Sequence, residues 1–382
     1  MPTRRQSGIE LLRILAMIGI VARHYAKQAG NIDVFAQCSS FNKYWLEVFF
    51  NPLGKVGVVL FFAITAWFLC NRSNSLKSSC KRIWIMEREL LFWSLTIATS
   101  LIVVWGVTGQ KTIGLTVIVK SFLPLSTDLW WYPTSYAVFL VILPFLNAGL
   151  RILDQKQHFA MVVVTMLMWT IIGGWIPQIQ YNMVEMNFIE FIYLFVLISY
   201  LKLYGKIPSK KASFGMILAG FLIVALYVCA AQLVFIKTDS HADLQSYIVD
   251  KAWTVPVLLI SFGMFAIALQ SRMESRAVNW VAQSAFATYL ISQHPVVANY
   301  LWNNTLDFKA IYGSVWLPLA SLGIIILVFI VCTLLDLVRR GIFALTCDRN
   351  RGGWFEKAWQ AVNPKQKIEL LQKKISRRID SQ

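Results

Sequence analysis

Long apolar runs alternate with short polar stretches along the whole chain. Each run covers about 17–25 residues, which is the length that an α-helix needs to cross the hydrocarbon core of a bilayer. Apolar residues follow one another without alternation inside each run, so the pattern excludes a membrane β-barrel. We therefore expect an all-α, polytopic integral membrane helical bundle of about ten transmembrane helices. The expected spans cover residues 9–29, 52–70, 88–108, 129–148, 159–177, 187–204, 212–236, 253–270, 280–299 and 313–338.

The composition excludes a water-soluble globule. Of the 382 residues, 57% are hydrophobic and only 14% are charged, whereas roughly a quarter of the residues of a soluble domain are charged. The formal net charge of +17 raises nucleic acid as a partner. In a membrane protein, however, basic residues first report the orientation of the helices. We expect membrane lipids as partners and no nucleic acid.

The distribution of Lys and Arg predicts the orientation. When the N-terminus is placed in the cytoplasm, the cytoplasmic loops and residues 339–382 hold most of the basic residues. This asymmetry satisfies the positive-inside rule and predicts an N-in, C-in topology. Residues 1–338 then form the membrane domain, and residues 339–382 form a basic cytoplasmic tail. The tail from Arg339 onward is expected to lie on anionic lipid, and its stretch 365–378 has a helical pattern.

Three further features refine this arrangement. Residues 109–127 are only moderately hydrophobic, and we expect a partial or re-entrant element there. The first apolar run lacks a small-residue cleavage site, so we expect no cleavable signal peptide. The six cysteines show no CxxC pair and no metal-ligand spacing, which predicts free thiols and no metal site. His158 and His241 fall in predicted loops and are expected to be solvated.

The first span carries ionisable residues that point to chemistry. Arg13 and His24 are eleven residues apart, so they share one helix face, about 16.5 Å apart along the axis. Ionisable groups inside a span are costly and by default indicate function. His24 can then accept a proton from a hydroxyl group. The alternative is that Arg13 and Glu10 extend to the cytoplasmic interface while His24 faces external water.

Four segments resemble the membrane acyltransferase-3 family. In residues 10–24 an acidic residue, an arginine and, eleven residues later, a histidine are similar to the signature of that family's first span. Residues 60–69 resemble its aromatic second span. Residues 128–147 and 285–295 are similar to the "YWF…AY…PFLN" and "FGVYLIHxxP" stretches of its polysaccharide-modifying branch. The resemblance runs from about residue 7 to residue 338.

Two departures from the family pattern concern polar residues. The Arg-x-x-Arg pair that often enters the third span is replaced by Lys81 and Arg82, followed by Arg88. The histidine of the last segment is Ser292, and His294 lies two positions later on another helix face. We assign a catalytic role to neither Ser292 nor His294.

The resemblance implies an O-acetyltransferase of the bacterial plasma membrane. The acyl group, expected to be acetyl, would pass from cytoplasmic acetyl-CoA to a hydroxyl of a cell-surface or exported polysaccharide or its lipid-linked glycan precursor. The implied catalytic residues are His24 and Arg13, and the implied CoA-binding residues are Arg13, Arg82 and Arg88, because arginines recognise phosphates. His24 acts either as a general base or as a transient acyl carrier, and the sequence leaves both open.

Further predictions and alternatives concern partners and individual residues. The resemblance also includes relatives with a fused soluble esterase-like domain, which is not expected in this sequence. The protein would then either complete the transfer itself or pass the group to a separate extracytoplasmic partner, and a homodimer also stays open. Trp130, Trp131 and Tyr132 form either a platform for the sugar or an ordinary interfacial aromatic belt. Arg82 and Arg88, expected in a basic cytoplasmic loop, either bind phosphate or only set the topology.

Two other classes of protein remain as alternatives. A polytopic secondary transporter of a small molecule or lipid-linked sugar would also carry charges inside its spans. Such transporters are expected to have paired halves with broken helices at corresponding positions, and the sequence shows no such symmetry. A polytopic scaffold or lipid-binding protein would not require Arg13 and His24 on one face.

Overall fold

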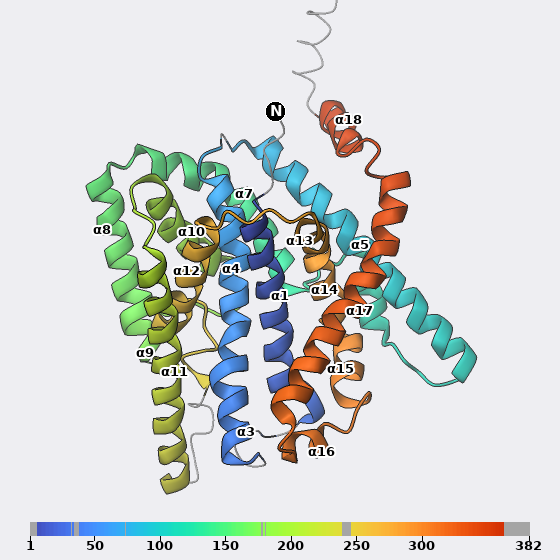
Figure 1. Ribbon diagram of the computed structural model, residues 1–382. Coiled ribbons are helices and arrows are strands. Elements are labelled where there is room, and N and C mark those ends of the chain that lie inside the picture. The colour runs from blue at the N-terminus through green and yellow to red at the C-terminus, as the bar shows by residue number, and fades with distance from the viewer. Residues whose placement is uncertain are drawn as a thin grey trace, which may run out of the picture.

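The computed structural model describes residues 6–31, 33, 38–72, 74–176, 179, 181–238 and 246–362. Every regular element within these residues is a helix, and the helices pack side by side as a bundle (Figure 1). Six helical segments of the described chain are long and apolar enough to cross a membrane. The prediction of an all-α membrane bundle is therefore confirmed, while the number of ten crossings and the N-in, C-in topology stay predictions.

The longer helices follow one another along the chain with short connections. They are α1 (Ser7–Gln28), α4 (Asn51–Leu69), α5 (Leu76–Thr108), α7 (Trp131–Ile152), α8 (Gln155–Thr165), α10 (Phe188–Leu203), α11 (Lys210–Thr238), α12 (Val255–Leu269) and α17 (Leu317–Leu345). The shorter elements are η1 (Ala29–Asn31), α3 (Ser40–Tyr44), η2 (Trp45–Phe50), α6 (Leu115–Phe122), η3 (Met166–Ile172), α9 (Gly173–Trp175), α13 (Arg276–Val281), η5 (Ala282–Ser284), α14 (Ala285–Ser292), α15 (Pro295–Asn303), α16 (Phe308–Gly313) and α18 (Gly353–Val362).

Each predicted span coincides with one of these helices or with a run of them, and two differences from prediction have a clear local cause. Helix α5 begins at Leu76 and not near residue 88, because Ser75 and Ser78 form a capping box that starts the helix in the basic stretch. The span predicted over 280–299 is interrupted between α14 and α15. Pro295, which lacks an amide hydrogen, occupies the first position of α15.

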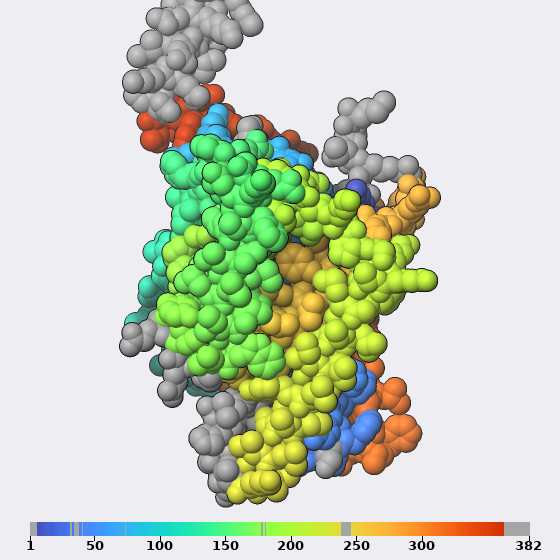
Figure 2. Space-filling view, turned by 90° about the vertical axis from the view of Figure 1, so that its left-hand side faces the viewer, coloured from blue at the N-terminus to red at the C-terminus, as the bar shows by residue number. Residues whose placement is uncertain are grey.

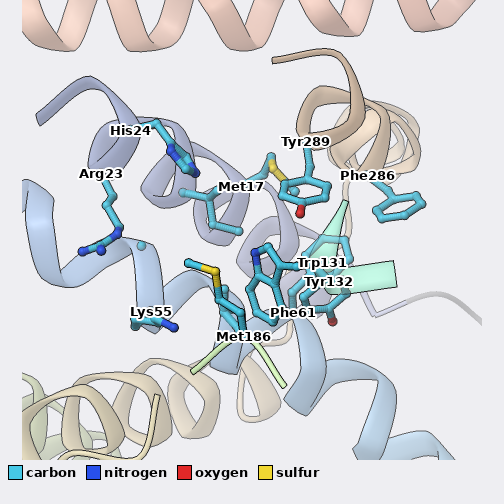
Figure 3. A pocket seen from close by; sticks show the side chains of 13 residues that line it. Met17, Arg23, His24, Lys55, Phe61, Trp131, Tyr132, Met186, Phe286 and Tyr289 are labelled. Atoms are coloured by element: carbon cyan, nitrogen blue, oxygen red, sulfur yellow. The ribbon is translucent and has the colours of Figure 1, made fainter. Parts of the chain in front are cut away.

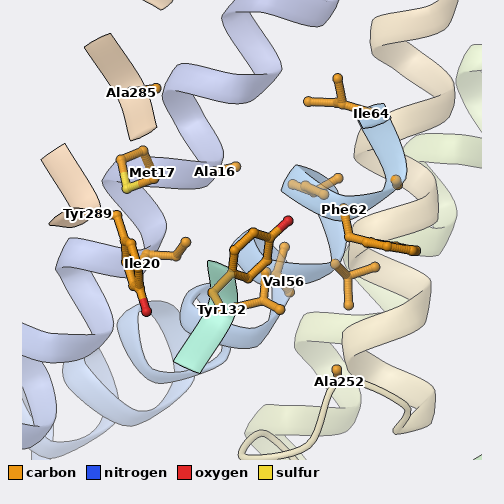
Figure 4. Close-up of a cluster of buried hydrophobic side chains, with 14 of the residues drawn as sticks. Ala16, Met17, Ile20, Val56, Phe62, Ile64, Tyr132, Ala252, Ala285 and Tyr289 are labelled. Carbon is orange, nitrogen blue, oxygen red and sulfur yellow. The ribbon is translucent and has the colours of Figure 1, made fainter. Parts of the chain in front are cut away.

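Helices α1 and α4 pack against each other with their backbones close together. A Cβ atom added to Gly57 would lie 2.4 Å from the carbonyl oxygen of Ala16, and one added to Gly54 would lie 1.9 Å from Cδ of Arg23. Small residues at such positions allow membrane helices to approach closely. Met17 and Ile20 of α1 are part of the buried cluster that fills the centre of the bundle (Figure 4).

Helix α4 occupies the interior of the bundle and α11 its periphery. In their most apolar windows, 78% of the segment that contains α4 is buried, against 17% for α11. Large apolar side chains of α11 are exposed, and such a surface on a bundle of this kind suits contact with lipid. Helix α12 is visible between α8 and α11, where an apolar cavity of about 370 Å3 lies (Figure 2).

The start of α1 and helix α18 lie at one end of the bundle, and α3 and α16 lie at the other (Figure 1). Helix α18 is held against the start of α5, because Glu356 pairs with Lys77 at 2.7 Å and with Lys81 at 2.8 Å. Helix α17 continues past residue 338, so the division of the chain at 338/339 stays a prediction. The tail stretch 365–378 lies outside the described residues.

The moderately hydrophobic stretch 109–127 contains one short helix, α6, between irregular segments. Its Ser121 carbonyl accepts a hydrogen bond of 2.7 Å from the hydroxyl of Ser94 on α5. The hydroxyl of Ser94 therefore satisfies a carbonyl in the last turn of α6 and ties this short helix to α5. Whether the stretch enters the membrane stays a prediction.

Candidate active site

One face of α1 carries Arg13, Met17, Ile20 and His24. Their spacing of four, three and four residues follows the helical repeat, so the four side chains lie in one row. Met17, Ile20 and His24 line one cavity, and Arg13 lines a second. Arg13 and His24 therefore lie on the same face of α1, as expected, but each lines a different one of two neighbouring cavities.

The first cavity, here called the histidine cavity, lies between α1, α4, α7 and α14 and has a volume of about 50 Å3. His24 borders it together with Lys55 of α4 and with a largely aromatic wall (Figure 3). Gln28, one turn further along α1, makes a side-chain hydrogen bond with His24. On the order of four water molecules fit in such a volume, so the site suits a small reacting group.

The second cavity, here called the arginine cavity, has a volume of about 410 Å3 and lies near the end of the bundle that carries α18. Its lining holds five arginines but only two acidic side chains, which gives it a strong positive potential. A further cavity of about 620 Å3 adjoins it and shares Arg13 and Glu89 with it. The five arginines are Arg13, Arg82, Arg88, Arg339 and Arg351.

The two cavities meet at a partition of three aromatic side chains. Phe61 of α4, Tyr132 of α7 and Phe286 of α14 line both of them. The guanidinium of Arg13 lies over the Phe61 ring, 5.7 Å from its centroid, on the side of the arginine cavity. The partition therefore separates a spacious cationic chamber from a small chamber that contains an imidazole.

The arginines of the arginine cavity differ in how far they are already paired. Within the part of the chain that the structure describes, Arg82 donates two long hydrogen bonds to neutral groups, to Asn74 at 3.4 Å and to Ser78 at 3.3 Å. Arg88 instead donates to Asp348 at 3.1 Å. Arg82 is thus the better placed of the two to bind an anionic group. Both lie on α5, so the prediction of a basic loop at these positions is wrong.

Arg339 forms more ion pairs with carboxylates than Arg82 or Arg88 does. Its guanidinium pairs with Asp336 at 2.5 Å and with Glu89 at 3.4 Å, and it lies 5.0 Å from the centroid of Phe343. A buried guanidinium with two carboxylates is held in a fixed position. Sequence reasoning assigned Arg339 to a lipid-bound tail, whereas the structure places it in the wall of the cavity.

A polar network lies beside the histidine cavity. Arg23 pairs with Asp250 at 2.6 Å and donates to Asn51 at 2.5 Å. Asn51 donates in turn to Glu47 at 2.7 Å, and Lys27 pairs with the same carboxylate at 3.2 Å. This network ties α1 to the start of α4 and to the segment before α12. Sequence reasoning missed it, because its members lie far apart in the chain.

The three predicted sugar-platform residues occupy different environments. Trp131 and Tyr132 line the histidine cavity. Trp130 is only 2% exposed and packs edge-on against His294, with 5.9 Å between ring centroids. Trp131 and Tyr132 therefore line a cavity, whereas Trp130 lines neither of the two cavities, and the sugar platform stays a prediction.

Two other histidines are buried away from these cavities. His158, expected to be solvated, is fully buried on α8, and its Nε2 lies 3.2 Å from the carbonyl oxygen of Val196, so that prediction is wrong. His294 is also fully buried at the break between α14 and α15. Ser292 donates to the carbonyl oxygen of Thr288 at 2.7 Å. His241 lies outside the described residues.

Lys55 is the functional candidate that sequence reasoning overlooked. It lies within an apolar span, and a lysine in such a position is by itself a signal of function. Its ammonium is almost completely buried beside the histidine cavity.

The arrangement of an arginine cavity, an aromatic partition and a histidine cavity agrees with a comparison of the sequence with known families. The profile of the acyltransferase-3 family, described as an acyltransferase domain, matches residues 6–337. No curated protein and no solved structure matches the chain. A match over this share of the chain, together with its apolar helices, shows that the protein belongs to the acyltransferase-3 family of membrane acyltransferases.

Proposed function

We propose that this membrane acyltransferase moves an acetyl group from cytoplasmic acetyl-CoA to a hydroxyl of a cell-surface or exported polysaccharide or its lipid-linked precursor, in a bacterial plasma membrane. The observation that carries the proposal is the pair of cavities that meet at Phe61, Tyr132 and Phe286. One cavity offers cationic groups for phosphates, and the other offers a base.

The arginine cavity suits the phosphates of CoA. Its volume lies within the range of 300–1,000 Å3 that is usual for small-molecule sites. Guanidinium groups bind phosphate oxygens through paired hydrogen bonds. Arg82, whose partners are neutral, and Arg13, whose pairing with Glu10 spans 3.6 Å, are the first candidates for these contacts.

The histidine cavity suits a short acyl group and the acceptor hydroxyl. A volume of about 50 Å3 favours acetyl over longer chains. His24 takes the proton of the attacking hydroxyl as a general base. In the other route, the imidazole attacks the thioester and carries the acetyl group to the acceptor. The aromatic faces of Trp131 and Tyr132 suit contact with a sugar ring.

The aromatic partition explains how transfer competes with hydrolysis. A thioester exposed to water is lost by hydrolysis, so the reacting group needs a closed path. Phe61 and Phe286 line both cavities, so their apolar rings would limit the entry of water from the polar arginine cavity. A transporter, the alternative class, would require a path for its whole substrate, which the small histidine cavity does not favour.

Proton NMR of surface polysaccharide tests the proposal. The O-acetyl signals are compared between cells that express the wild type, His24→Ala or no copy of the protein, in a strain that lacks its own copy. We expect acetyl signals only with the wild type. Equal signals in all three strains would contradict a role in polysaccharide acetylation.

A further inference from the structure

The ammonium group of Lys55 lies in an unusual environment for a membrane span. Its side chain is only 4% exposed and borders the histidine cavity. Among the residues that the structure describes, Nζ of Lys55 has no hydrogen-bond partner. A buried ammonium with three unused donors is costly unless another group completes its coordination.

Two carboxylates lie near Lys55 without accepting a hydrogen bond from its ammonium group. Nζ lies 3.7 Å from Glu185 and 3.9 Å from Glu190, beyond hydrogen-bond distance, and 5.6 Å from the ring centroid of Trp131. Oε1 of Glu190 already accepts a hydrogen bond of 2.8 Å from the backbone amide of Met186. The two carboxylates therefore lie near the ammonium group of Lys55 but accept no hydrogen bond from it.

Glu190 is fixed in this position by the backbone that it binds. Met186 has a φ of 59°, in the left-handed region that a side chain disfavours. Such a conformation persists only where the surroundings hold it, and the bond from the Met186 amide to Glu190 is one such restraint. Oε1 of Glu190 is thus held by the Met186 amide at 3.9 Å from Nζ of Lys55.

Lys55 differs in this respect from Arg23, the other cation that lines the histidine cavity. The guanidinium of Arg23 is occupied by Asn51 and Asp250. His24 is the base. Lys55 can therefore donate a hydrogen bond to a negative charge that develops in the cavity without breaking an existing hydrogen bond.

On the basis of the proposed function, we infer that Lys55 is a further catalytic residue that hydrogen-bonds to the carbonyl oxygen of the acyl group during transfer. The acceptor oxygen forms a bond to the carbonyl carbon while His24 takes its proton, and the carbonyl oxygen becomes an oxyanion beside Lys55. Collapse of this intermediate breaks the carbon–sulfur bond. The thiolate leaves and receives the proton from His24, and Lys55 stays protonated throughout.

The electrostatics of the cavity favour this role. When His24 gains a proton, the histidine cavity gains a positive charge and the acyl oxygen gains a negative one, so the total charge is unchanged. Donors that are fixed in place before the reaction stabilise such an oxyanion most strongly where water is excluded. Lys55 is held in place by its buried stem on α4, by Trp131 and by the two carboxylates.

Lys55→Met tests the inference, since methionine keeps much of the length and removes the charge. The matched control is Lys251→Met, because Lys251 is also a buried lysine over an aromatic ring, 3.6 Å from the centroid of Tyr247, but lines neither cavity. Purified proteins in detergent are assayed with acetyl-CoA and surface polysaccharide whose acetyl groups have been removed by mild alkali. Acetyl-CoA hydrolysis without polysaccharide is measured in parallel.

We expect kcat of Lys55→Met to fall about 10²–10³-fold, the usual effect of removing one oxyanion donor. The slow hydrolysis should fall with it, because water attacks the same carbonyl group, while the KM for polysaccharide changes little. Lys251→Met should keep the wild-type kcat. A Lys55→Met enzyme with wild-type kcat, or with only a raised polysaccharide KM and normal hydrolysis, would overturn the inference and assign Lys55 to acceptor binding.

A second variant separates catalysis from folding. In Lys55→Ala, added ethylammonium should restore part of kcat, because the small cation can enter the space that the side chain vacates. Absence of rescue in a monodisperse protein that still binds acetyl-CoA would speak against the role. An inactive wild type would refute the proposed function itself, whereas an active wild type with an equally active Lys55→Met would refute only the role of Lys55.

Discussion

The arginine cavity and the histidine cavity adjoin each other but differ in size and in chemistry. The first has a volume of about 410 Å3 and five arginines, several of them partly exposed. The second has a volume of about 50 Å3, a largely aromatic wall and few polar groups. Under the proposed function, the arginine cavity would bind the phosphates of acetyl-CoA, and the smaller histidine cavity would hold the reacting groups. Substitutions in the two chambers should therefore change different kinetic constants.

The largest effect is expected in the histidine cavity. His24→Ala should lower kcat by about 10²–10⁴-fold, the usual contribution of a positioned general base, with little change in the affinity for acetyl-CoA. Acetyl transfer by purified protein measures the first quantity, and calorimetric titration with acetyl-CoA measures the second. His158→Gln serves as a control, because His158 lies on α8 and lines neither cavity. Wild-type turnover in His24→Ala would contradict the proposal that the reaction takes place in the histidine cavity.

The next effect belongs to the arginine cavity. Arg82→Ala should weaken acetyl-CoA binding by roughly 10–100-fold, as expected for the loss of a hydrogen bond to a charged group, while kcat at saturation changes little. Arg88→Ala should have a smaller effect, because Asp348 already occupies that guanidinium. The same titration compares both variants. An equal loss in the two would mean that the existing pairing of an arginine does not decide its role.

A smaller effect is expected at the partition. Phe286→Ala would open a passage between the two cavities, so water could enter the histidine cavity from the polar side. We expect the hydrolysis of acetyl-CoA to rise several-fold relative to transfer. The two rates are measured as free acetate and as polysaccharide-bound acetate. An unchanged ratio would show that Phe286 does not separate the chambers.

The smallest effect is expected for stability, at the contact between α18 and the start of α5. Hydrogen bonds from Lys77 and Lys81 lower the pKa of Glu356 below its usual value. The contribution of this carboxylate to stability is therefore present above the unfolded pKa of about 4.3 and is lost as the pH falls through the lower folded pKa. We expect Glu356 to contribute less than about 1 kcal/mol to the free energy of unfolding, because its ion pairs with the two lysines are partly exposed to solvent.

Amide hydrogen exchange of residues 353–362 at several pH values measures this contact. Protection should decrease at acidic pH in the wild type, and Glu356→Gln should show low protection at every pH. An acid-sensitive contact in Glu356→Gln as well would assign the pH dependence to another group.

Local rules account for what could be predicted from the sequence. The common face of Arg13 and His24 follows from the helical repeat alone, and the apolar runs define the helices. The break before Pro295 also has a local cause that the prediction of a continuous span did not use. Such features depend on neighbours in the chain and not on the arrangement of distant helices.

The remainder of the site depends on tertiary contacts. Nothing in the sequence near Arg339 indicates that Glu89 would be its partner. Likewise, Trp130 and Trp131 are adjacent and chemically alike, yet only Trp131 lines the histidine cavity, because adjacent residues at the start of α7 point in different directions. Lys55 could be noticed as a charge in a span, but its unused donors became visible only with Glu185 and Glu190 in place.

The glycines between α1 and α4 have a consequence for how the enzyme can vary. Gly57 lets the α4 backbone approach the carbonyl oxygen of Ala16, and Gly54 leaves room for the side chain of Arg23. These two glycines therefore set how α1, which carries His24, packs against α4, which carries Lys55. The aromatic wall, in contrast, comes from α7 and α14. Under the proposed function, a change of acceptor would arise by replacing wall residues one at a time, while the packing of α1 against α4 stays unchanged.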